Sequence, residues 1–198
     1  MAKLVDIHTH RPLDETFRTI STAGIHPYDV DTADDSTLEA IERVADDVDA
    51  IGEIGLDGVC SSDFDKQEQI FRKQLFIAQH HKKGVVIHAV RAFEKVMKIL
   101  EEHTLPFVIF HGFIGSVEQA RQAVNRGYFL SFGERTFHSS KTIKALQETP
   151  LDHIFVESDT SRMPLEEIYA KIAEILSTEP HKLAKQIDEN FEQLFSDC

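Results

Sequence analysis

The 198-residue sequence has only two cysteines, Cys60 and Cys198, and they lie far apart along the chain. Two such cysteines are too few for the disulfide framework of a small secreted domain, so we expect both to be reduced thiols in a cytoplasmic protein. Neither cysteine belongs to a Cys-x-x-Cys pair. This spacing excludes a zinc site built from thiolates.

Long apolar runs are also missing. The sequence has no stretch of eighteen or more apolar residues, so we expect no membrane-spanning helix and no membrane partner. The charged residues Lys3 and Asp6 stand close to the start, which does not fit the apolar core of a secretory signal. We therefore expect a cytoplasmic protein without a leader sequence.

Basic residues are scarce, because 21 Lys and Arg face 34 Asp and Glu for a formal net charge of −13. Such a charge opposes long-range attraction to nucleic acid and argues against tight, extended, metal-independent DNA binding. Bound divalent cations would nevertheless add positive charge where an anionic substrate must sit. The composition therefore does not exclude a phosphodiester substrate.

The sequence has no low-complexity linker, internal repeat or domain boundary, and 41% of its residues are apolar. We expect one domain over residues 1–198, which is long enough to bury a sizeable core. Short apolar runs bounded by Gly, Pro or charged residues alternate with amphipathic stretches. The predicted strands are Leu4–Ile7, Arg18–Ala23, Ala50–Ile54, Gly84–His88, Phe107–Phe110, Tyr128–Ser131 and Ile154–Glu157.

Amphipathic helices are predicted between most of these strands. Ser36 and Ser116 each precede a Glu or Gln by three residues, which is the spacing of a capping box. Pro164 and Pro180 are well placed to open two further helices. The predicted helices begin near residues 36, 65, 93, 116, 164 and 180.

Strands that alternate with helices predict βαβ units and a parallel sheet, either as a closed barrel or as an open, doubly wound sheet. Nearly every predicted strand ends in a His, Glu or Asp. A barrel brings side chains from many strand ends to one catalytic face, whereas an open sheet concentrates its site at one switch point. We therefore predict an α/β fold of the TIM-like (β/α) barrel type, seven-stranded or distorted.

The first strand ends in Asp6-Ile7-His8-Thr9-His10, in which His8 and His10 project to the same side of an extended segment. The pair can hold one cation, although two loop histidines without a function fit the spacing equally well. Glu53 lies in Gly52-Glu53-Ile54-Gly55, where the glycines let the backbone turn closely around the carboxylate. Glu53 can then bridge two ions, and the alternative is an acidic turn on the surface.

Two later strands each end in a histidine, because His88 follows Val85-Val86-Ile87 and His111 follows Val108-Ile109-Phe110. One such histidine is more often a hydrogen-bonded core residue, but two in successive units favour a metal site. The segment Phe155–Asp159 likewise closes an apolar strand with carboxylates. These donors suit one or two divalent cations such as Zn²⁺, Mn²⁺, Ni²⁺ or Mg²⁺. The predicted metal ligands are His8, His10, Glu53, His88, His111 and Asp159.

The ordered motifs resemble those of TatD-type hydrolases, a branch of the amidohydrolase superfamily. They are DIHTH, GIHP, GEIGLD, IHAVRA, HGFIGS, ESDTSRMP and, near the C-terminus, DENFEQLF. The resemblance covers nearly the whole chain. It implies a barrel with two adjacent divalent ions and an enzyme that hydrolyses phosphodiester bonds in DNA. It implies that one ion is held by His8, His10, Glu53 and Asp159, and the other by Glu53, His88 and His111.

Some features depart from the family pattern. Fourteen residues, Arg11 to Gly24, separate His10 from Ile25-His26-Pro27, where several dozen are typical. The shortened segment indicates that a strand–helix unit is missing, which agrees with seven predicted strands. Arg91 and Tyr28 stand where other residues are common in the family. These changes affect predicted substrate-binding positions and leave the metal ligands intact.

We expect metal-assisted hydrolysis with Asp159 as the catalytic base and Glu53 as the second catalytic carboxylate. His26 is a predicted phosphate contact, or alternatively caps a turn, and Arg91 is a second phosphate contact or a solvated residue at a helix start. Asp57 either orients a ligand histidine or caps a turn. The expected partner is a phosphodiester or other small hydrolysable substrate such as a DNA end, and a monomer is favoured. The alternatives are an amidohydrolase acting on an amide, ester or lactone, and a metal-binding member without activity.

Overall fold

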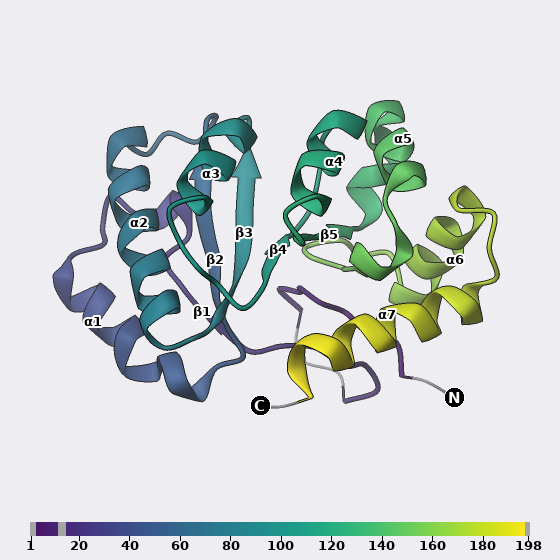
Figure 1. Ribbon diagram of the computed structural model, residues 1–198, viewed down its shortest axis with the longest axis horizontal. Helices are drawn as coiled ribbons and strands as arrows, with labels where there is room; N and C mark the ends of the chain where they lie inside the picture. Colours follow the sequence, from purple (N-terminus) through teal and green to yellow (C-terminus); the bar gives the residue numbers. More distant parts are fainter. Residues whose placement is uncertain (1–2, 12–14, 197–198) are drawn as a thin grey trace. The chain divides into compact units, whose positions relative to one another are not determined.

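The computed structural model describes residues 3–11 and 15–196. The chain divides into two compact units. We name residues 1–20 with 111–198 the terminal unit, and residues 21–110 the central unit. Each unit has its own parallel strands and helices, which are labelled in Figure 1. The expectation of one domain over residues 1–198 stays a prediction.

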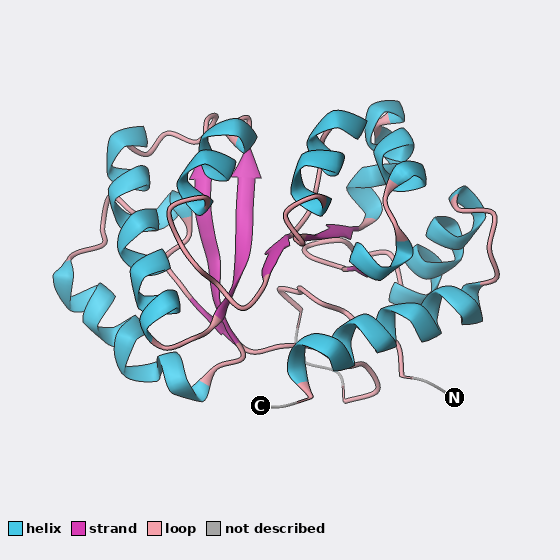
Figure 2. Cartoon of the chain, in the orientation of Figure 1, coloured by secondary structure: helices cyan, strands magenta, loops and turns pink. Residues whose placement is uncertain are grey.

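The central unit contains four strands, and each is parallel to its neighbour. In order they are β1 (Thr22–Ala23), β2 (Ala50–Asp57), β3 (Gly84–Val90) and β4 (Val108–Phe110). The helices are α1 (Asp35–Val44), α2 (Phe64–His80) and α3 (Phe93–Leu100), with 3₁₀ helices at Pro27–Asp29 and Ala45–Asp47. The long strands are β2 and β3 (Figure 2), and α2 packs against both.

The terminal unit contains β5 (Phe129–Phe132) and β6 (Ile154–Val156), which pair in parallel. Residues 4–9 run beside β6, because the Ile7 amide donates to the Val156 carbonyl at 3.1 Å and Thr9 bridges to Asp159. The helices are α4 (Val117–Val124), α5 (Ser140–Glu148), α6 (Leu165–Ile175) and α7 (Pro180–Phe195), with 3₁₀ helices at Glu134–His138 and Leu151–His153. Both units therefore show the predicted alternation of parallel strands and helices.

The buried side-chain amide of Asn190 in the terminal unit is paired. The α7 helix turns Ile187 and Phe191 into the core and buries Asn190 between them. The Asn190 Nδ2 donates to the carbonyl oxygens of Leu151 at 2.8 Å and Ile154 at 2.9 Å. These bonds offset the cost of burying an amide and attach α7 to the start of β6.

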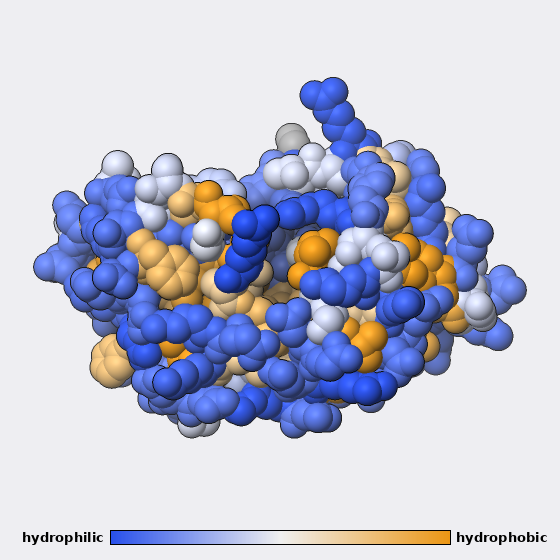
Figure 3. Space-filling view, turned by 90° about the horizontal axis from the view of Figure 1, so that it is seen from above, coloured by the Kyte–Doolittle hydropathy of each residue, from blue (hydrophilic) through white to orange (hydrophobic). Residues whose placement is uncertain are grey.

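Hydrophilic residues cover most of the face drawn in Figure 3, and hydrophobic residues form small separate groups there. In the described part of the chain, we find no helix with the length and apolar character that crossing a bilayer requires. Cys60 is a free thiol, and Cys198 lies outside the described residues.

Two predicted strands differ from the structure. Residues 4–7 do not form a regular strand, because Val5 pairs with Arg18 and Thr9 pairs with Asp159 only through isolated bridges. The predicted strand Arg18–Ala23 shortens to Thr22–Ala23. Single bridges do not build a ladder of successive hydrogen bonds, so the described residues contain six regular strands instead of seven.

The observed helix starts match the predicted ones where the sequence offers a single residue that can cap the helix. The predicted capping box at Ser116 is present before α4. The α1 helix is capped by Asp34 instead of Ser36, since the Asp34 carboxylate accepts from the Thr37 amide at 3.0 Å. Aspartate and serine are equally good helix caps, which explains why α1 begins after Asp34 and not after Ser36. The α5 helix has no counterpart among the predicted helices.

Candidate metal centre

A bulge in β2 sets the direction of Glu53. The β2–β3 register shifts between Ile51 and Ile54, so that Gly52 and Glu53 together oppose Val86 alone. A Cβ atom on Gly52 would lie 2.6 Å from the Val86 Cβ, and only glycine allows the strands to approach so closely. A bulge re-aims the side chain that it carries. The glycine predicted to let the backbone turn around Glu53 therefore has that function.

Glu53 lies between two histidines of the central unit. Its Oε2 is 3.7 Å from the His88 Nδ1 and 3.8 Å from the His26 Nε2. The centroids of the two imidazole rings are 4.5 Å apart. Ring nitrogens from a strand and a loop thus converge on one carboxylate, whose side chain is 7% exposed, and all three residues offer donor atoms within 4.8 Å of one another.

Asp57, at the end of β2, holds His88 from its other side. The His88 Nε2 lies 2.9 Å from the Asp57 Oδ2, while the Asp57 Oδ1 accepts from the amides of Val59 at 2.8 Å and Cys60 at 3.0 Å. Burial acts to raise the pKa of Asp57, but the hydrogen bonds from His88 and the two amides keep it below its ordinary value. An ionised carboxylate only accepts, so the His88 Nε2 is the donor of this hydrogen bond, and the Nδ1 on the other side of the ring is directed towards Glu53. Asp57 therefore caps the turn and also holds the His88 ring, while the assignment of His88 as a metal ligand stays a prediction.

His26 is positioned by two further contacts. Its Nδ1 accepts from the Tyr28 amide at 3.2 Å and caps the 3₁₀ helix at Pro27–Asp29. The neighbouring Ile25 is clamped by Gln74, whose Oε1 accepts from the Ile25 amide at 2.6 Å and whose Nε2 donates to the Ile25 carbonyl at 3.1 Å. The capping role considered for His26 is present, and its Nε2 remains directed towards Glu53.

The terminal unit gathers a second set of donors around His10. The His8 and His10 Nε2 atoms are 3.4 Å apart, and the His10 Nε2 is 3.6 Å from the Asp159 Oδ1. The His8 ring centroid is 4.5 Å from that of His111. The backbone holds this set in register, because the Asp159 amide donates to the His8 carbonyl at 3.0 Å and the His10 amide donates to the Asp159 carbonyl at 3.1 Å.

Glu157 is a member of this second set that was not among the predicted ligands. Its Oε1 lies 3.6 Å from the His111 Nδ1, and its side chain is 2% exposed. Burial acts to raise the pKa of Glu157, but the adjacent His111 holds it below its ordinary value. His111, Glu157 and Asp159 offer three donor atoms within 4.8 Å of one another. The signal in the sequence was a strand-closing carboxylate two positions before Asp159.

A hydrogen-bond network fastens the two segments that carry these donors. The buried Asp6 accepts from the Ser158 amide at 2.7 Å and from the Ser158 hydroxyl at 2.6 Å. The Ser158 hydroxyl also lies 2.8 Å from the Thr9 hydroxyl. Burial raises the pKa of Asp6, while both hydrogen bonds from Ser158 act in the opposite direction. The network fixes the main chain that positions His8, His10 and Asp159.

Both donor sets fit a divalent ion. Two ligand atoms about 2.1 Å from one ion at a tetrahedral angle lie about 3.4 Å apart. The donor pairs described above are 3.4 to 3.8 Å apart, which is long for hydrogen bonds and suits ligands of a shared ion. The donors are imidazole nitrogens and carboxylate oxygens, so they fit the predicted Zn²⁺, Mn²⁺, Ni²⁺ or Mg²⁺.

The six predicted ligands divide between the units. His8, His10, His111 and Asp159 come together in the terminal unit, and Glu53 and His88 come together in the central unit. The idea that both sets share ions through Glu53 stays a prediction. Arg91 is an exposed residue just before α3, and its backbone φ is 49°. Its contact with a substrate phosphate stays a prediction.

The chain matches the model of the TatD related DNase family over residues 9–196. It is 34% identical over 163 residues to the uncharacterized metal-dependent hydrolase YjjV of Escherichia coli (strain K12), which covers 77% of this chain and 62% of that relative. It is 36% identical over 143 residues to the uncharacterized metal-dependent hydrolase YabD of Bacillus subtilis (strain 168), with coverages of 69% and 56%. The matched region spans less than two thirds of the length of these relatives.

Solved structures share the fold. The YjjV TatD homolog from Escherichia coli K12 matches with a TM-score of 0.83 and 25% identity, over 92% of this chain and 78% of that chain. A TatD family hydrolase from Entamoeba histolytica matches with a TM-score of 0.77 and 16% identity, over 90% and 75%. These matches confirm the predicted α/β fold class of the TatD barrels.

Proposed function

Because the chain belongs to the TatD related DNase family, we propose that it is a divalent-metal-dependent hydrolase that cleaves phosphodiester bonds. The observation that carries this proposal is the pair of His8 and His10 Nε2 atoms, 3.4 Å apart, with the Asp159 carboxylate 3.6 Å from His10. Two imidazoles and a carboxylate at ligand spacing suit an ion that is open to substrate.

Two divalent ions complete the proposed centre. His8, His10, Glu53 and Asp159 would hold one ion, and Glu53, His88 and His111 would hold the other. The donor spacings within each unit support this assignment, and Glu53 is the carboxylate proposed to serve both ions. Glu157 lies at ligand spacing from His111, and His26 lies at ligand spacing from Glu53. Each would therefore be an additional donor close to one of the two ions.

Bound ions would make a water molecule more acidic and draw charge from the phosphoryl oxygens of the substrate. Asp159 is the proposed base, because its Oδ1 lies beside the donor nitrogens and can accept a proton from the attacking water. His26 and Arg91 are the proposed contacts to the substrate phosphate. The expected monomeric state and cytoplasmic location stay predictions.

The test is hydrolysis of bis(4-nitrophenyl) phosphate by protein loaded with Mn²⁺ or Zn²⁺. The variant Asp159→Asn should lose at least about a hundredfold in kcat, since it removes the base and weakens a ligand. Asp152→Asn is the matched control, because Asp152 is an exposed residue of the same unit that contacts His153. Equal rates for wild type and Asp159→Asn would remove Asp159 from the mechanism.

The same loaded protein should be offered an amide, an ester and a lactone. Activity on these substrates without activity on the phosphodiester would favour the amidohydrolase alternative. A loaded protein inert towards the whole panel would favour a metal-binding member without catalysis.

A further inference from the structure

The terminal unit has a pocket of about 370 Å³ beside Asp159, which is in the size range of small-molecule sites. Two segments form most of its wall: one is the start of the 3₁₀ helix that follows β5, and the other is the loop that follows β6. All of the lining residues belong to the terminal unit. They are Gly112, Ile114, Gly133–Thr136 and Glu157–Arg162.

Two guanidinium groups distinguish this pocket in a strongly acidic chain. Arg135 and Arg162 both line it and are both exposed. Neither has a carboxylate partner in an ion pair among the residues that the structure describes. Basic side chains in a protein of net charge −13 normally have many acidic neighbours, so two without such a partner in one pocket indicate an anionic ligand.

The loop that carries Arg162 is held in place. The Ser161 hydroxyl donates to Glu134, and the same oxygen accepts from the Met163 amide at 3.0 Å. The Arg11 Nη2 donates to the Met163 carbonyl at 3.0 Å. These contacts engage the Glu134 carboxylate and order the backbone on both sides of Arg162, which reduces the entropy cost of binding a ligand there.

Part of the pocket wall belongs to the candidate metal centre, because Glu157 and Asp159 both line it. Ions bound by these donors would neutralise the two carboxylates and leave two guanidinium groups, Arg135 and Arg162, against the single carboxylate of Glu134. Ile114, which is 41% exposed, adds an apolar surface suited to a sugar or base. The pocket therefore joins a reaction site to an anion site.

We propose that this pocket binds a second phosphate group of the substrate, next to the phosphodiester that is cleaved, through Arg135 and Arg162. This inference rests on the proposed function and narrows it to substrates that carry adjacent phosphates, such as nucleotides within or at the end of a nucleic acid strand. A simple diester with one phosphate would leave the two guanidinium groups without a ligand. Guanidinium groups bind phosphate oxygens through paired hydrogen bonds, which gives such a site both strength and direction.

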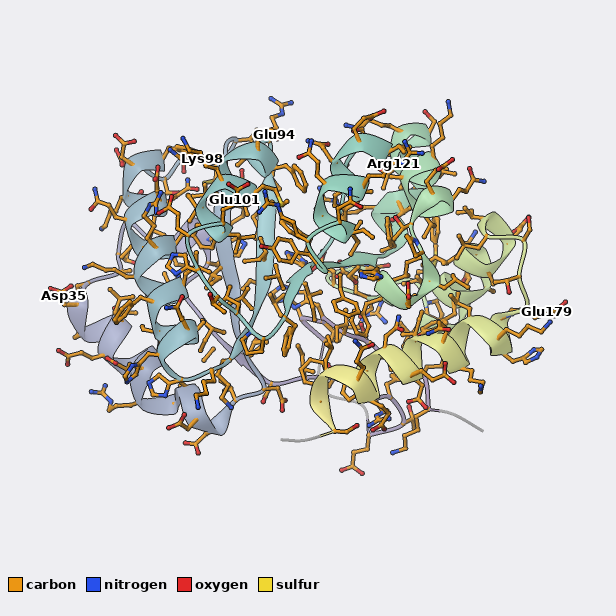
Figure 4. The ribbon with its side chains drawn as sticks, viewed as in Figure 1. Asp35, Glu94, Lys98, Glu101, Arg121 and Glu179 are labelled. Atoms are coloured by element: carbon orange, nitrogen blue, oxygen red, sulfur yellow. The ribbon has the colours of Figure 1, made fainter. Side chains whose placement is uncertain are left out.

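The test compares two chromogenic substrates with the metal-loaded protein. Thymidine 5′-(4-nitrophenyl phosphate) has one phosphate, and its 3′-phosphorylated form has two. The ratio of kcat/KM for the second substrate to that for the first should fall about tenfold in Arg162→Gln and in Arg135→Gln. Arg121→Gln is the matched control, because Arg121 lies on α4 (Figure 4), outside the lining residues, and its guanidinium is 2.9 Å from the Glu148 carboxylate.

Binding supplies a readout that does not depend on turnover. Calorimetric titration of loaded wild type should give a lower Kd for thymidine 3′,5′-bisphosphate than for thymidine 5′-monophosphate, and the two pocket variants should lose this difference. Equal affinities in wild type, or an unchanged ratio in both variants, would overturn the second phosphate site. If the singly phosphorylated substrate is still cleaved in that case, the proposed function stands without this site. If neither substrate is cleaved, the proposed function fails, and the titration alone decides the inference.

Discussion

Asp6 accepts two hydrogen bonds from Ser158, one from its backbone amide at 2.7 Å and one from its hydroxyl at 2.6 Å. The two residues are 152 positions apart in the sequence. Asp6 precedes the His8–His10 pair, and Ser158 precedes Asp159, so this contact aligns donors from opposite ends of the chain. It is a support for the proposed ligands and contributes no ligand itself.

Asp6→Asn should weaken binding of Zn²⁺ about tenfold, as losing a partner behind metal ligands commonly does. Ser158 uses both carboxylate oxygens of Asp6, and in asparagine an N–H₂ donor replaces one of them, so one of the two hydrogen bonds is lost or must reverse its direction. Isothermal titration with a competing chelator measures the affinity, and Asp152→Asn is the control. An affinity equal to that of wild type would show that the network does not position the ligands.

Asp57→Asn should reduce the amount of metal held by the central unit while leaving the turn after β2 intact. The remaining oxygen can still accept from Val59 and Cys60, but the new amide would donate to the His88 Nε2 and move the proton to the Nδ1 that faces Glu53. Nitrogen-15 NMR of the histidine rings reports the tautomer, and elemental analysis reports the bound metal. An unchanged tautomer with full metal content would contradict this role of Asp57.

Gly55→Ala should destabilise the protein by more than about 3 kcal/mol. The Gly55 φ is +142°, and an added Cβ would lie 2.0 Å from the His88 carbonyl oxygen. Gly127→Ala is the control, because its φ of +77° has open space around it and should cost only about 1 to 2 kcal/mol. Urea unfolding measures both free energies, and similar losses would show that the close approach to His88 can relax.

Adding Zn²⁺ to the metal-free protein should raise its Tm. A ligand at a hundred times its Kd stabilises the native state by about 2.7 kcal/mol. The double variant His8→Ala with His10→Ala should lose most of this gain, since it removes two donors 3.4 Å apart. His181→Ala, which removes an exposed histidine of α7, should keep it. A full shift in the double variant would place the stabilising ion elsewhere.

The sequence predicted the donors that local periodicity places together. His8 and His10 share a face because an extended segment repeats every two residues, and His88 and His111 stand out because they close apolar strands. The bulge that redirects Glu53 could not be predicted, since it depends on how β2 pairs with β3. The Gly52 in that bulge was the only local sign of it.

Contacts over long sequence distances were not predictable from the sequence. The pairing of Asp6 with Ser158 and the approach of Glu157 to His111 exist only once strands from distant segments lie side by side. The pocket residues come from two distant segments, Arg135 from the 3₁₀ helix after β5 and Arg162 from the loop after β6, so neither carried a signal alone. The α5 helix was not predicted, because its segment has one capping serine and few apolar residues and so gives only a weak helical pattern.

The proposed hydrolase depends on the His8–His10 pair and the Nδ1 of His88 acting as metal ligands. Crystals of zinc-loaded wild type, measured at the zinc absorption edge, locate bound ions directly. We expect one anomalous peak about 2.1 Å from the Nε2 atoms of His8 and His10 and another at about the same distance from the His88 Nδ1. Fully loaded crystals with no peak within about 3 Å of any of these nitrogens would contradict the proposal.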